Sequence, residues 1–388
     1  MRVALITTDN REDRRDYTSE LPWFGTAVQA LLDGFAELPD EIEVHVLSCT
    51  RAHLPSPLQL APNIIFHSIH VPSWAWLKTF YLANIIAVRN RLKKIRPDIV
   101  HGQGTERDCA LAAAFSGYPN LITLHGNMRQ LAKLFPAPLW SFSRLTAFLE
   151  SVALRMAGGC VCLSTHSRKL VAPLAKQTWL VPNAVDPAFL AVDRAEASPL
   201  PLILMVGDVT PNKNQLAFLN AVAPLQTEFD FKVRIFGKSD PTHPYTSELL
   251  NFIAKNPWCV IGDFLNRESL KRQMASATLL ALPSLEENLP MVILEAMAIG
   301  LPVAASHVGG IPDMIKHGQT GILFDPRDPE SIRKALRSML MNPTDCNHIT
   351  VQAHENILLK HLPQTIARRH LQVYQDLLKE NCHHPTKL

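Results

Sequence analysis

The sequence contains no long apolar run, no cysteine framework and no strong excess of one charge. No uninterrupted apolar stretch reaches the roughly 18 residues that a membrane-spanning helix requires. The opening segment turns polar at Asp9, too early for a signal peptide. Seven scattered cysteines predict reduced thiols and no metal site, and a net charge of +3 is too small to indicate nucleic acid as a partner. We therefore expect a cytoplasmic protein, and contact with the inner surface of a membrane is an open alternative.

A second absence concerns the nucleotide-binding loops. Neither half of the chain follows its first predicted strand with G-x-G-x-x-G, which argues against a dinucleotide-dependent oxidoreductase. In the first half a long loop ends at Gly25 and Thr26, where a helix N-terminus can still offer N–H groups to a phosphate. A glycine chosen for helix packing is the alternative there. In the second half Gly207 leads to Lys213, which is placed for a diphosphate, and a solvated surface lysine is the plainer interpretation.

The composition and the order of segments predict an α/β protein. With 388 residues, of which 47% are hydrophobic, the chain is long enough for two domains. Short β-branched runs alternate with longer helical patterns, which favours parallel sheets covered by helices on both faces. The polar, proline-flanked segment 193–201 is typical of a linker. We expect two doubly wound, Rossmann-like domains, residues 1–192 and 200–363, facing each other across a cleft.

The expected elements follow from these patterns. The expected strands are Arg2–Thr7, Glu43–Ser48, Ile64–Ser68, Ile99–His101, Asn120–Thr123, Cys160–Leu163, Thr178–Val181, Leu202–Gly207, Phe231–Phe236, Trp258–Ile261, Thr278–Leu282, Pro302–Ala305 and Gly321–Phe324. The expected helices lie near Gly25–Glu37, Leu77–Lys94, Asp108–Phe115, Ser141–Arg155, Ser167–Ala172, Asn214–Ala223, Thr246–Lys255, Arg267–Ala275, Met291–Ile299, Gly310–Lys316, Pro329–Leu340 and Gln364–Glu380.

The most specific stretch runs from Pro283 to Val303 and carries two carboxylates. Glu287 lies in a polar loop, and Glu295, eight positions later, lies in an apolar helical run that stops at Gly300. Eight helical residues advance about 12 Å, so the two side chains could touch the two ends of one elongated ligand. Carboxylates accept hydrogen bonds from sugar or ribose hydroxyls without a metal. The alternative is two solvated glutamates, which fits Glu295 poorly because an unpaired charge is costly in apolar surroundings.

Two histidines of the first half follow predicted strands. His101 ends the strand Ile99–His101, and His125 comes just after Asn120–Thr123. Ligands of open parallel sheets bind at this end of the strands. A structural role is the alternative for each histidine. Arg129, four residues beyond His125, is placed to meet an anion.

These segments together resemble a known enzyme family. Glu287 and Glu295, followed by Gly300 and Pro302, resemble the signature of the retaining glycosyltransferases of family 4, which have the two-domain GT-B fold. The resemblance covers nearly the whole chain, is strongest over residues 203–330 and is weaker before residue 95. Further segments similar to this family are 97–101, 123–126, 181–186, 308–313 and 317–323.

The resemblance implies a role for each matching residue. Glu287 would bind hydroxyls of the donor sugar, Glu295 the nucleotide ribose, and Lys213 the donor diphosphate. His125 would line the reaction centre, and Gly25 would lie in a loop that approaches phosphate or acceptor. The final helix, about 364–388, would cross back onto the acceptor-side N-terminal domain. The segment that would offer backbone N–H groups to the sugar or phosphate is Asn288, Leu289, Pro290 and Met291.

The sequence departs from the family pattern at two positions. Asp208, five residues before Lys213, stands where the family usually has an arginine. Like charges about 4 Å apart cost on the order of 4 kcal/mol at an effective dielectric near 20. Three outcomes are open: Asp208 points away, a cation such as Arg129 or Arg14 compensates, or donor binding is weak. Thr26 stands where a second glycine is frequent, and a positive φ would be disfavoured there.

The primary hypothesis is transfer of a hexosyl group from a nucleotide-diphospho-sugar to a hydroxyl of a sugar, glycan or lipid-linked acceptor. The anomeric configuration would be retained, in polysaccharide or glycolipid biosynthesis, with neither metal nor cofactor. The alternative, motivated by Asp208, is a catalytically weak GT-B protein that binds nucleotide or glycan within an assembly. Aromatic and basic residues over 74–96 and 128–148 indicate either contact with anionic lipid or a core with solvated basic edges.

Overall fold

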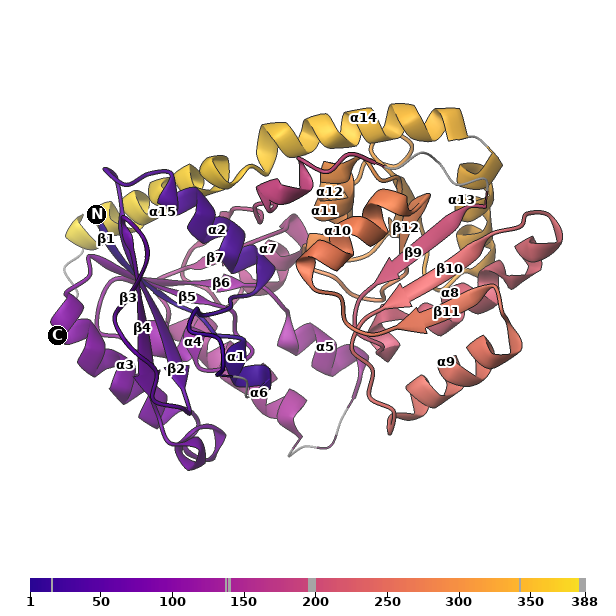
Figure 1. The fold of residues 1–388 in the computed structure, drawn as a ribbon. Helices are drawn as coiled ribbons and strands as arrows, with labels where there is room; N and C mark the ends of the chain where they lie inside the picture. The colour runs from indigo at the N-terminus through magenta and orange to yellow at the C-terminus, as the bar shows by residue number, and fades with distance from the viewer. Residues whose placement is uncertain (15–16, 137, 139–140, 195–199, 342, 384–388) are drawn as a thin grey trace. The chain divides into compact units, whose positions relative to one another are not determined.

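The structure is a computed structural model that describes residues 1–14, 17–136, 138, 141–194, 200–341 and 343–383. It forms two compact units (Figure 1). The first contains Met1–Ala184 and the residues from Leu362 onward, and the second is Val185–His361. Each unit is built on one mainly parallel sheet, which confirms the predicted α/β class. The predicted linker 193–201 lies partly outside the described residues.

The sheet of the first unit has the strand order β3-β4-β2-β1-β5-β6-β7-β8. All neighbours pair in parallel except β3, which runs antiparallel to β4 at the edge. Side chains alternate between its faces, so Val3 and Leu5 join one apolar cluster while Ala4 and Ile6 join another. The strands are β1 Arg2–Ile6, β2 Glu43–Thr50, β3 Leu58–Ala61, β4 Ile64–His70, β5 Ile99–Gln103, β6 Asn120–Leu124, β7 Cys160–Cys162 and β8 Thr178–Leu180.

Helices cover both faces of this sheet. The cluster on one face includes residues of α2 and of the C-terminal helix α15, which lies along α2 (Figure 1). The cluster on the other face includes residues of α3, α4 and α6. The helices of the unit are α1 Arg11–Arg14, α2 Thr26–Ala36, α3 Leu82–Ile95, α4 Cys109–Ala114, α5 Met128–Leu134, α6 Phe142–Met156, α7 Thr165–Val171 and α15 Pro363–His383.

The second unit has a fully parallel sheet in the order β11-β10-β9-β12-β13-β14. The order reverses between β9 and β12, and ligands of such sheets bind at this switch point beyond the carboxyl ends of the strands. The strands are β9 Leu202–Val206, β10 Lys232–Phe236, β11 Cys259–Gly262, β12 Leu279–Leu282, β13 Val303–Ser306 and β14 Ile322–Phe324. The helices are α8 Gln215–Val222, α9 Pro244–Lys255, α10 Arg267–Ser276, α11 Met291–Ile299, α12 Ile311–Met314, α13 Pro329–Met341 and α14 Pro343–Lys360.

Every expected strand is present, and the differences lie elsewhere. The sequence reading missed β3, α1, α5 and α14, which are short, at an edge, or without a clear apolar spacing. The expected helix over 77–94 was also wrong as one element. A 3₁₀ turn, Leu77–Thr79, is followed by Phe80 and Tyr81 with φ of 50° and 63° before α3 begins. The Tyr81 side chain is thereby buried, so tertiary packing overrides local helix propensity.

Within the described residues, no helix is both long and apolar enough to cross a membrane.

Candidate functional site

Two loops meet at the switch point of the second unit. One follows β9 and ends in a 3₁₀ turn, Pro211–Lys213, and the other follows β12 and leads into α11. The Asn212 side chain donates to the Glu286 carbonyl at 3.1 Å, and the Leu285 N–H donates to the Asn212 carbonyl at 2.7 Å. These bonds hold the two loops together at the carboxyl ends of adjacent strands.

Lys213 and Glu287 are brought into direct contact by this arrangement. The Lys213 ammonium forms an ion pair with Glu287 Oε1, and the Ser284 hydroxyl donates to the same oxygen at 2.7 Å. Both side chains are mostly buried, with exposed fractions of 24% and 12%. The sequence singled out both residues, but it treated them as separate ligand contacts rather than as partners.

A glycine pair fixes the backbone of this loop. The Gly310 N–H donates to the Glu287 carbonyl at 3.0 Å. Gly309 has φ of 55°, and a Cβ there would fall 1.9 Å from the same carbonyl oxygen. Any side chain at position 309 would therefore push Glu287 out of place.

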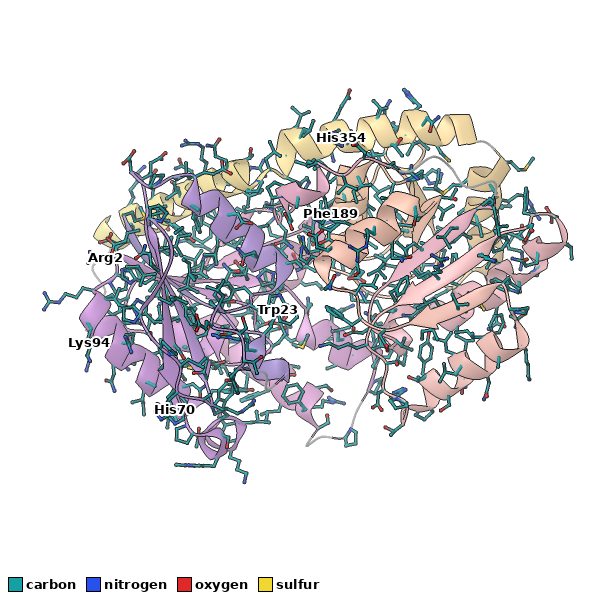
Figure 2. All side chains as sticks on the ribbon, in the orientation of Figure 1. Arg2, Trp23, His70, Lys94, Phe189 and His354 are labelled. Atoms are coloured by element: carbon teal, nitrogen blue, oxygen red, sulfur yellow. The ribbon has the colours of Figure 1, made fainter. Side chains whose placement is uncertain are left out.

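Glu295 lies on α11 and is 3% exposed. Its Oε1 accepts a hydrogen bond from Arg267 Nη1 at 2.9 Å. The same guanidinium donates to Asp186 Oδ2 at 2.6 and 3.0 Å and stacks 4.8 Å above the ring of Phe189, which Figure 2 labels. Burial raises the pKa of Glu295, while Arg267 acts in the opposite direction. The partner that an apolar setting requires for Glu295 is thus Arg267, which sequence reasoning did not identify.

The residues before α11 differ in what their backbones can offer. Asn288 and Leu289 are buried, and α11 begins at Met291 after Pro290. Pro290 has no N–H group, so the expectation of an N–H donor at that position was wrong. Donors in this segment come from its other residues.

Asp208 is exposed and turned towards the loop after β10. Its Oδ1 accepts the Lys238 N–H at 3.1 Å, and its carbonyl accepts from Gln215 Nε2 at 3.1 Å. The first of the three open outcomes therefore has geometric support. The Arg129 guanidinium lies beside the Leu170 carbonyl of the first unit, and the Arg14 side chain lies outside the described residues.

The half-buried His125 follows β6 in the first unit, beside Gln103 at the end of β5. Its Nε2 lies 2.8 Å from Gln103 Oε1. Burial lowers the pKa of His125 to about 4, so the imidazole is neutral near pH 7. His101, by contrast, is fully buried and bonds to Tyr374 and Thr123, which gives it no exposed face.

A carboxylate that the sequence reading did not select lies next to His125. Glu106 Oε1 accepts the Gly126 N–H at 2.9 Å, and burial raises the pKa of this carboxyl. A Cβ at Gly104, whose φ is 85°, would fall 2.4 Å from Glu106 Oε2. Glu106 and Arg107 line a pocket together with Thr8, Asn10, Gln103, Gly104 and Cys109. Only Gly104 and Gly126, which lie against Glu106 in the fold, could have indicated this close approach from the sequence.

The remaining predicted residues of the first unit are placed as follows. Gly25 is the N-cap of α2, without a side-chain cap, and a Cβ there would meet nothing within 4 Å. Helix packing therefore does not require this glycine. Thr26 opens α2 and is not among the residues with positive φ, so the threonine brings no backbone strain. The Arg129 N–H donates to Glu150 at 3.1 Å, and its guanidinium lies 3.5 Å from the Leu170 carbonyl.

No group of three or more histidine, cysteine or carboxylate side chains with metal-binding geometry occurs among the described residues.

Two sequence profiles match the chain. The profile of the group 1 glycosyl transferases matches residues 200–342, and that of Glycosyltransferase Family 4 matches residues 25–189. Together the two matched ranges cover most of the sequence, and they include part of each unit. The chain belongs to glycosyltransferase family 4.

Relatives of this family 4 glycosyltransferase match different shares of its length. An uncharacterized glycosyltransferase of Methanocaldococcus jannaschii is 30% identical over 174 residues, covering 45% of this chain and 44% of the relative. The chain thus spans less than half of that protein's length. The alpha-maltose-1-phosphate synthase of Mycolicibacterium smegmatis is 26% identical over 410 residues, covering 97% of this chain and 99% of the relative.

Solved structures share the GT-B fold. The Anabaena protein HepE, crystallised with UDP-glucose, superposes with a TM-score of 0.72 at 16% identity, covering 97% of this chain and all of that chain. This similarity confirms the predicted fold of the glycosyltransferase.

Proposed function

We propose that this glycosyltransferase transfers a hexosyl group from a nucleotide-diphospho-sugar to an acceptor hydroxyl with retention at the anomeric carbon. The observation that carries the proposal is the contact of Lys213 and Glu287 at the β9–β12 switch point, in the loop that leads into the helix of the buried Glu295. Glu287 would bind donor-sugar hydroxyls and Glu295 the ribose. Lys213 and the N–H groups at the start of α11 would bind the diphosphate.

In the proposed reaction, a bond forms between the acceptor oxygen and the anomeric carbon as the bond from that carbon to the diphosphate oxygen breaks. The bonding electron pair leaves with the diphosphate, and the acceptor proton ends on a phosphate oxygen. Lys213 would stabilise the charge that develops on the leaving group. In doing so it exchanges Glu287 for phosphate, which frees the carboxylate for a sugar hydroxyl. His125, neutral near pH 7, would line the reaction centre without adding charge.

The donor class has support from similar proteins. HepE was crystallised with UDP-glucose, and the mycobacterial relative is named for a sugar-phosphate synthase activity. A thermal-shift screen of UDP-, GDP- and ADP-sugars would identify the nucleotide. One of them should raise the melting temperature in proportion to its occupancy.

Substitution of Glu287 tests the proposal. Glu287→Gln keeps the size of the side chain and the oxygen that Ser284 contacts, but it removes the charge. We expect the transfer rate to fall about 10²–10³-fold with the melting temperature nearly unchanged. The control is Glu248→Gln on α9, an exposed carboxylate of the same unit, which should transfer normally. Wild-type turnover by Glu287→Gln would refute the assignment.

The second candidate is a protein that binds nucleotide or glycan within an assembly and transfers poorly. Asp208, in place of the usual arginine, is the observation that favours it. Calorimetry with UDP and GDP separates the two candidates. Binding of neither nucleotide by the folded protein would favour the assembly role.

We also propose that the first unit touches an anionic lipid surface, as a lipid-linked acceptor would require. Trp74, Phe80, Leu82 and Ile86 are 51–68% exposed, an unusual concentration of apolar side chains on one short segment. The left-handed Phe80–Tyr81 pair turns Phe80 outward while Tyr81 stays buried. Exposed basic residues continue this face along α3 and at its end: Arg89, Lys93, Lys94 and Arg96. Lys94 is labelled in Figure 2.

Flotation with vesicles tests the lipid contact. We expect the protein to float with vesicles rich in phosphatidylglycerol, to float less in high salt, and to stay behind with phosphatidylcholine vesicles. Phe80→Ser should weaken flotation because it removes an exposed apolar contact. The control is Leu359→Ser on α14, 75% exposed in the second unit. Equal flotation with both lipids, or none, would remove the proposal.

A further inference from the structure

A buried polar cluster lies behind His125 in the first unit. It joins β5 and β6 of the sheet to α15, a helix from the far end of the chain. His101 and Tyr374 are fully buried, and Thr123, His370 and Gln103 are at most 5% exposed. Around them the cluster of α2 and α15 is otherwise apolar. Polar groups at such a position cost stability unless they are bonded to one another.

A chain of successive hydrogen bonds connects this cluster to His125. Tyr374 Oη lies 2.7 Å from His101 Nδ1, and Thr123 Oγ1 lies 2.7 Å from His101 Nε2. The side-chain nitrogen of Gln103 lies 3.2 and 3.4 Å from the two ring nitrogens of His101. Its oxygen lies 2.8 Å from His125 Nε2. An amide oxygen only accepts hydrogen bonds, so His125 carries its proton on Nε2 in this arrangement.

The groups of the cluster are uncharged near pH 7. Burial lowers the pKa of His370 to about 4 and that of His101 well below its usual range, and it raises the pKa of the Tyr374 hydroxyl. The hydrogen-bonded side chains therefore carry no charge near pH 7 and do not hold an extra proton. What it can fix is geometry, because each imidazole must present one donor and one acceptor to its neighbours.

The cluster also reaches the side of His125. A small cavity, with room for about one water molecule, is lined by Gln103, Thr123, His125 and His370 together with mainly apolar residues. If packing were the only requirement, apolar side chains such as the nearby Phe35 and Ile366 would fill the same space at a lower cost in free energy. The polar residues are thus placed where they act on the orientation of His125.

We propose that Tyr374 is a positioning residue for His125: acting through His101 and Gln103, it fixes the ring orientation and the Nε2–H tautomer of that histidine. The proposal rests on the proposed function, in which His125 lines the reaction centre. It assigns to α15 a part in the reaction that goes beyond covering the sheet.

Tyr374→Phe tests the proposal because it removes one hydroxyl and keeps the ring. We expect kcat to fall about tenfold with the KM for the donor nearly unchanged, since a small misplacement of a reacting group costs rate rather than binding. In ¹⁵N-histidine spectra, the His125 signal should change from one tautomer to a mixture. Tyr118→Phe is the matched control, because that hydroxyl donates to the Leu92 carbonyl at 3.3 Å in the same unit. It should leave kcat and the His125 signal unchanged.

Gln103→Glu gives a second, independent readout. A carboxylate against His125 Nε2–H favours the imidazolium, so the acidic limb of the kcat/KM profile should move up by about one pH unit or more. The other titratable groups facing His125 are His101, His370 and Glu106, and of these His101 also contacts the side chain at position 103.

The outcomes distinguish this proposal from the proposed function. Wild-type kcat and an unchanged His125 signal in folded Tyr374→Phe would overturn the positioning role. If Tyr374→Phe does not fold, an unmoved pH profile in Gln103→Glu would overturn it, because the proposal acts on His125 through Gln103. If the wild type transfers no sugar at all, the proposed function fails, while the tautomer spectra still decide whether Tyr374 positions His125.

Discussion

The candidate site residues of the two units are held by different kinds of polar group. In the second unit, charges occur in pairs: Lys213 with Glu287, and Arg267 with Asp186 and Glu295. In the first unit, His125 is neutral and is linked to other neutral groups through Gln103. Both arrangements satisfy buried polar atoms, but they respond differently to a ligand.

A paired charge is a replaceable partner. In the proposed function, an incoming phosphate would compete with Glu287 for Lys213, and a ribose hydroxyl would compete with Arg267 for Glu295. A neutral hydrogen-bonded group has no charge to exchange, so it contributes by being held in place. At these candidate residues, changes of charge should therefore act mainly through Lys213 and Arg267, and changes of geometry mainly through the groups around His125.

The largest expected effect is the removal of the lysine. Lys213→Met leaves Glu287 without its cation and the diphosphate without its countercharge. We expect kcat/KM for the donor to fall about 10²–10³-fold in steady-state assays. Lys255→Met, at an exposed position of α9, is the control. Because Lys213 and Glu287 form a pair, the double variant with Glu287→Gln should lose less than the two single losses combined. Additive losses would contradict the pairing.

Removal of Arg267 should act on stability. Arg267→Met leaves the buried Glu295 carboxylate without its cation, which should lower the free energy of unfolding by about 2–4 kcal/mol, because Arg267 itself is one-third exposed. The pKa of Glu295, already raised by burial, should rise further. The native state then binds more protons than the unfolded state, so the defect grows as pH increases. Urea unfolding at pH 5 and pH 8 measures it.

Two variants make that experiment decisive. Arg272→Met, exposed on the same helix, should unfold like the wild type. Adding Glu295→Gln to Arg267→Met should restore most of the loss by removing the uncompensated charge. If the defect were independent of pH, or if the double variant were no more stable, Arg267 would be acting through packing on Phe189 alone.

Acid should weaken the first unit through its histidines. The pKa of His370 is lowered to about 4 by burial, so below about pH 6.5 the unfolded state binds more protons than the native state. The free energy of unfolding therefore falls as pH decreases from about 6.5 towards 4. The fall at pH 5 is about 2 kcal/mol for this residue alone. His370→Gln should reduce that dependence. The pKa values raised by burial act in the opposite direction, at Glu295 in the second unit and at Glu106 and Glu150 in the first.

Hydrogen exchange read by mass spectrometry resolves the two units. On going from pH 7 to pH 5, after correction for intrinsic exchange rates, protection should fall in α2 and α15 more than in α8 and α11. Greater loss of protection in the second unit would reverse the comparison.

The smallest expected effect is at Asp208. Asp208→Asn keeps an oxygen for the Lys238 N–H and removes a negative charge near Lys213. Because Asp208 is exposed and turned away, we expect only about a two- to threefold gain in UDP affinity by calorimetry, and a smaller gain in high salt. Asp40→Asn, exposed in the first unit, is the control. A tenfold gain would mean that Asp208 faces the diphosphate.

The sequence was sufficient to predict the class of fold and the parallel strands, because a buried parallel strand is a short apolar run between turn signals. It also selected Lys213, Glu287, Glu295 and His125. It could not supply their partners. Arg267 is 28 positions from Glu295 in the chain and looks like any arginine at the start of a surface helix. Only the contact with Glu295 in the folded structure distinguishes Arg267 from an ordinary surface arginine.

The same limit applies to His101 and Glu106. His101 looked like a candidate ligand group because of its place at a strand end, but its partner Tyr374 is 273 residues away, and burial gives the histidine an internal role. Glu106 gave no pattern of its own, since the backbone N–H that it accepts belongs to Gly126, 20 positions away. Long-range partners of this kind follow from topology, which local periodicity does not encode.

The position of α15 in the chain has a consequence for synthesis. During translation the first unit emerges long before residues 363–383, which supply Tyr374, His370 and part of its apolar core. Until the ribosome has read through the whole second unit, His101 lacks its hydroxyl partner and the face of the sheet beside α2 is uncovered. The unit encoded first is therefore the one completed last, and it is the one that needs protection from aggregation on the way.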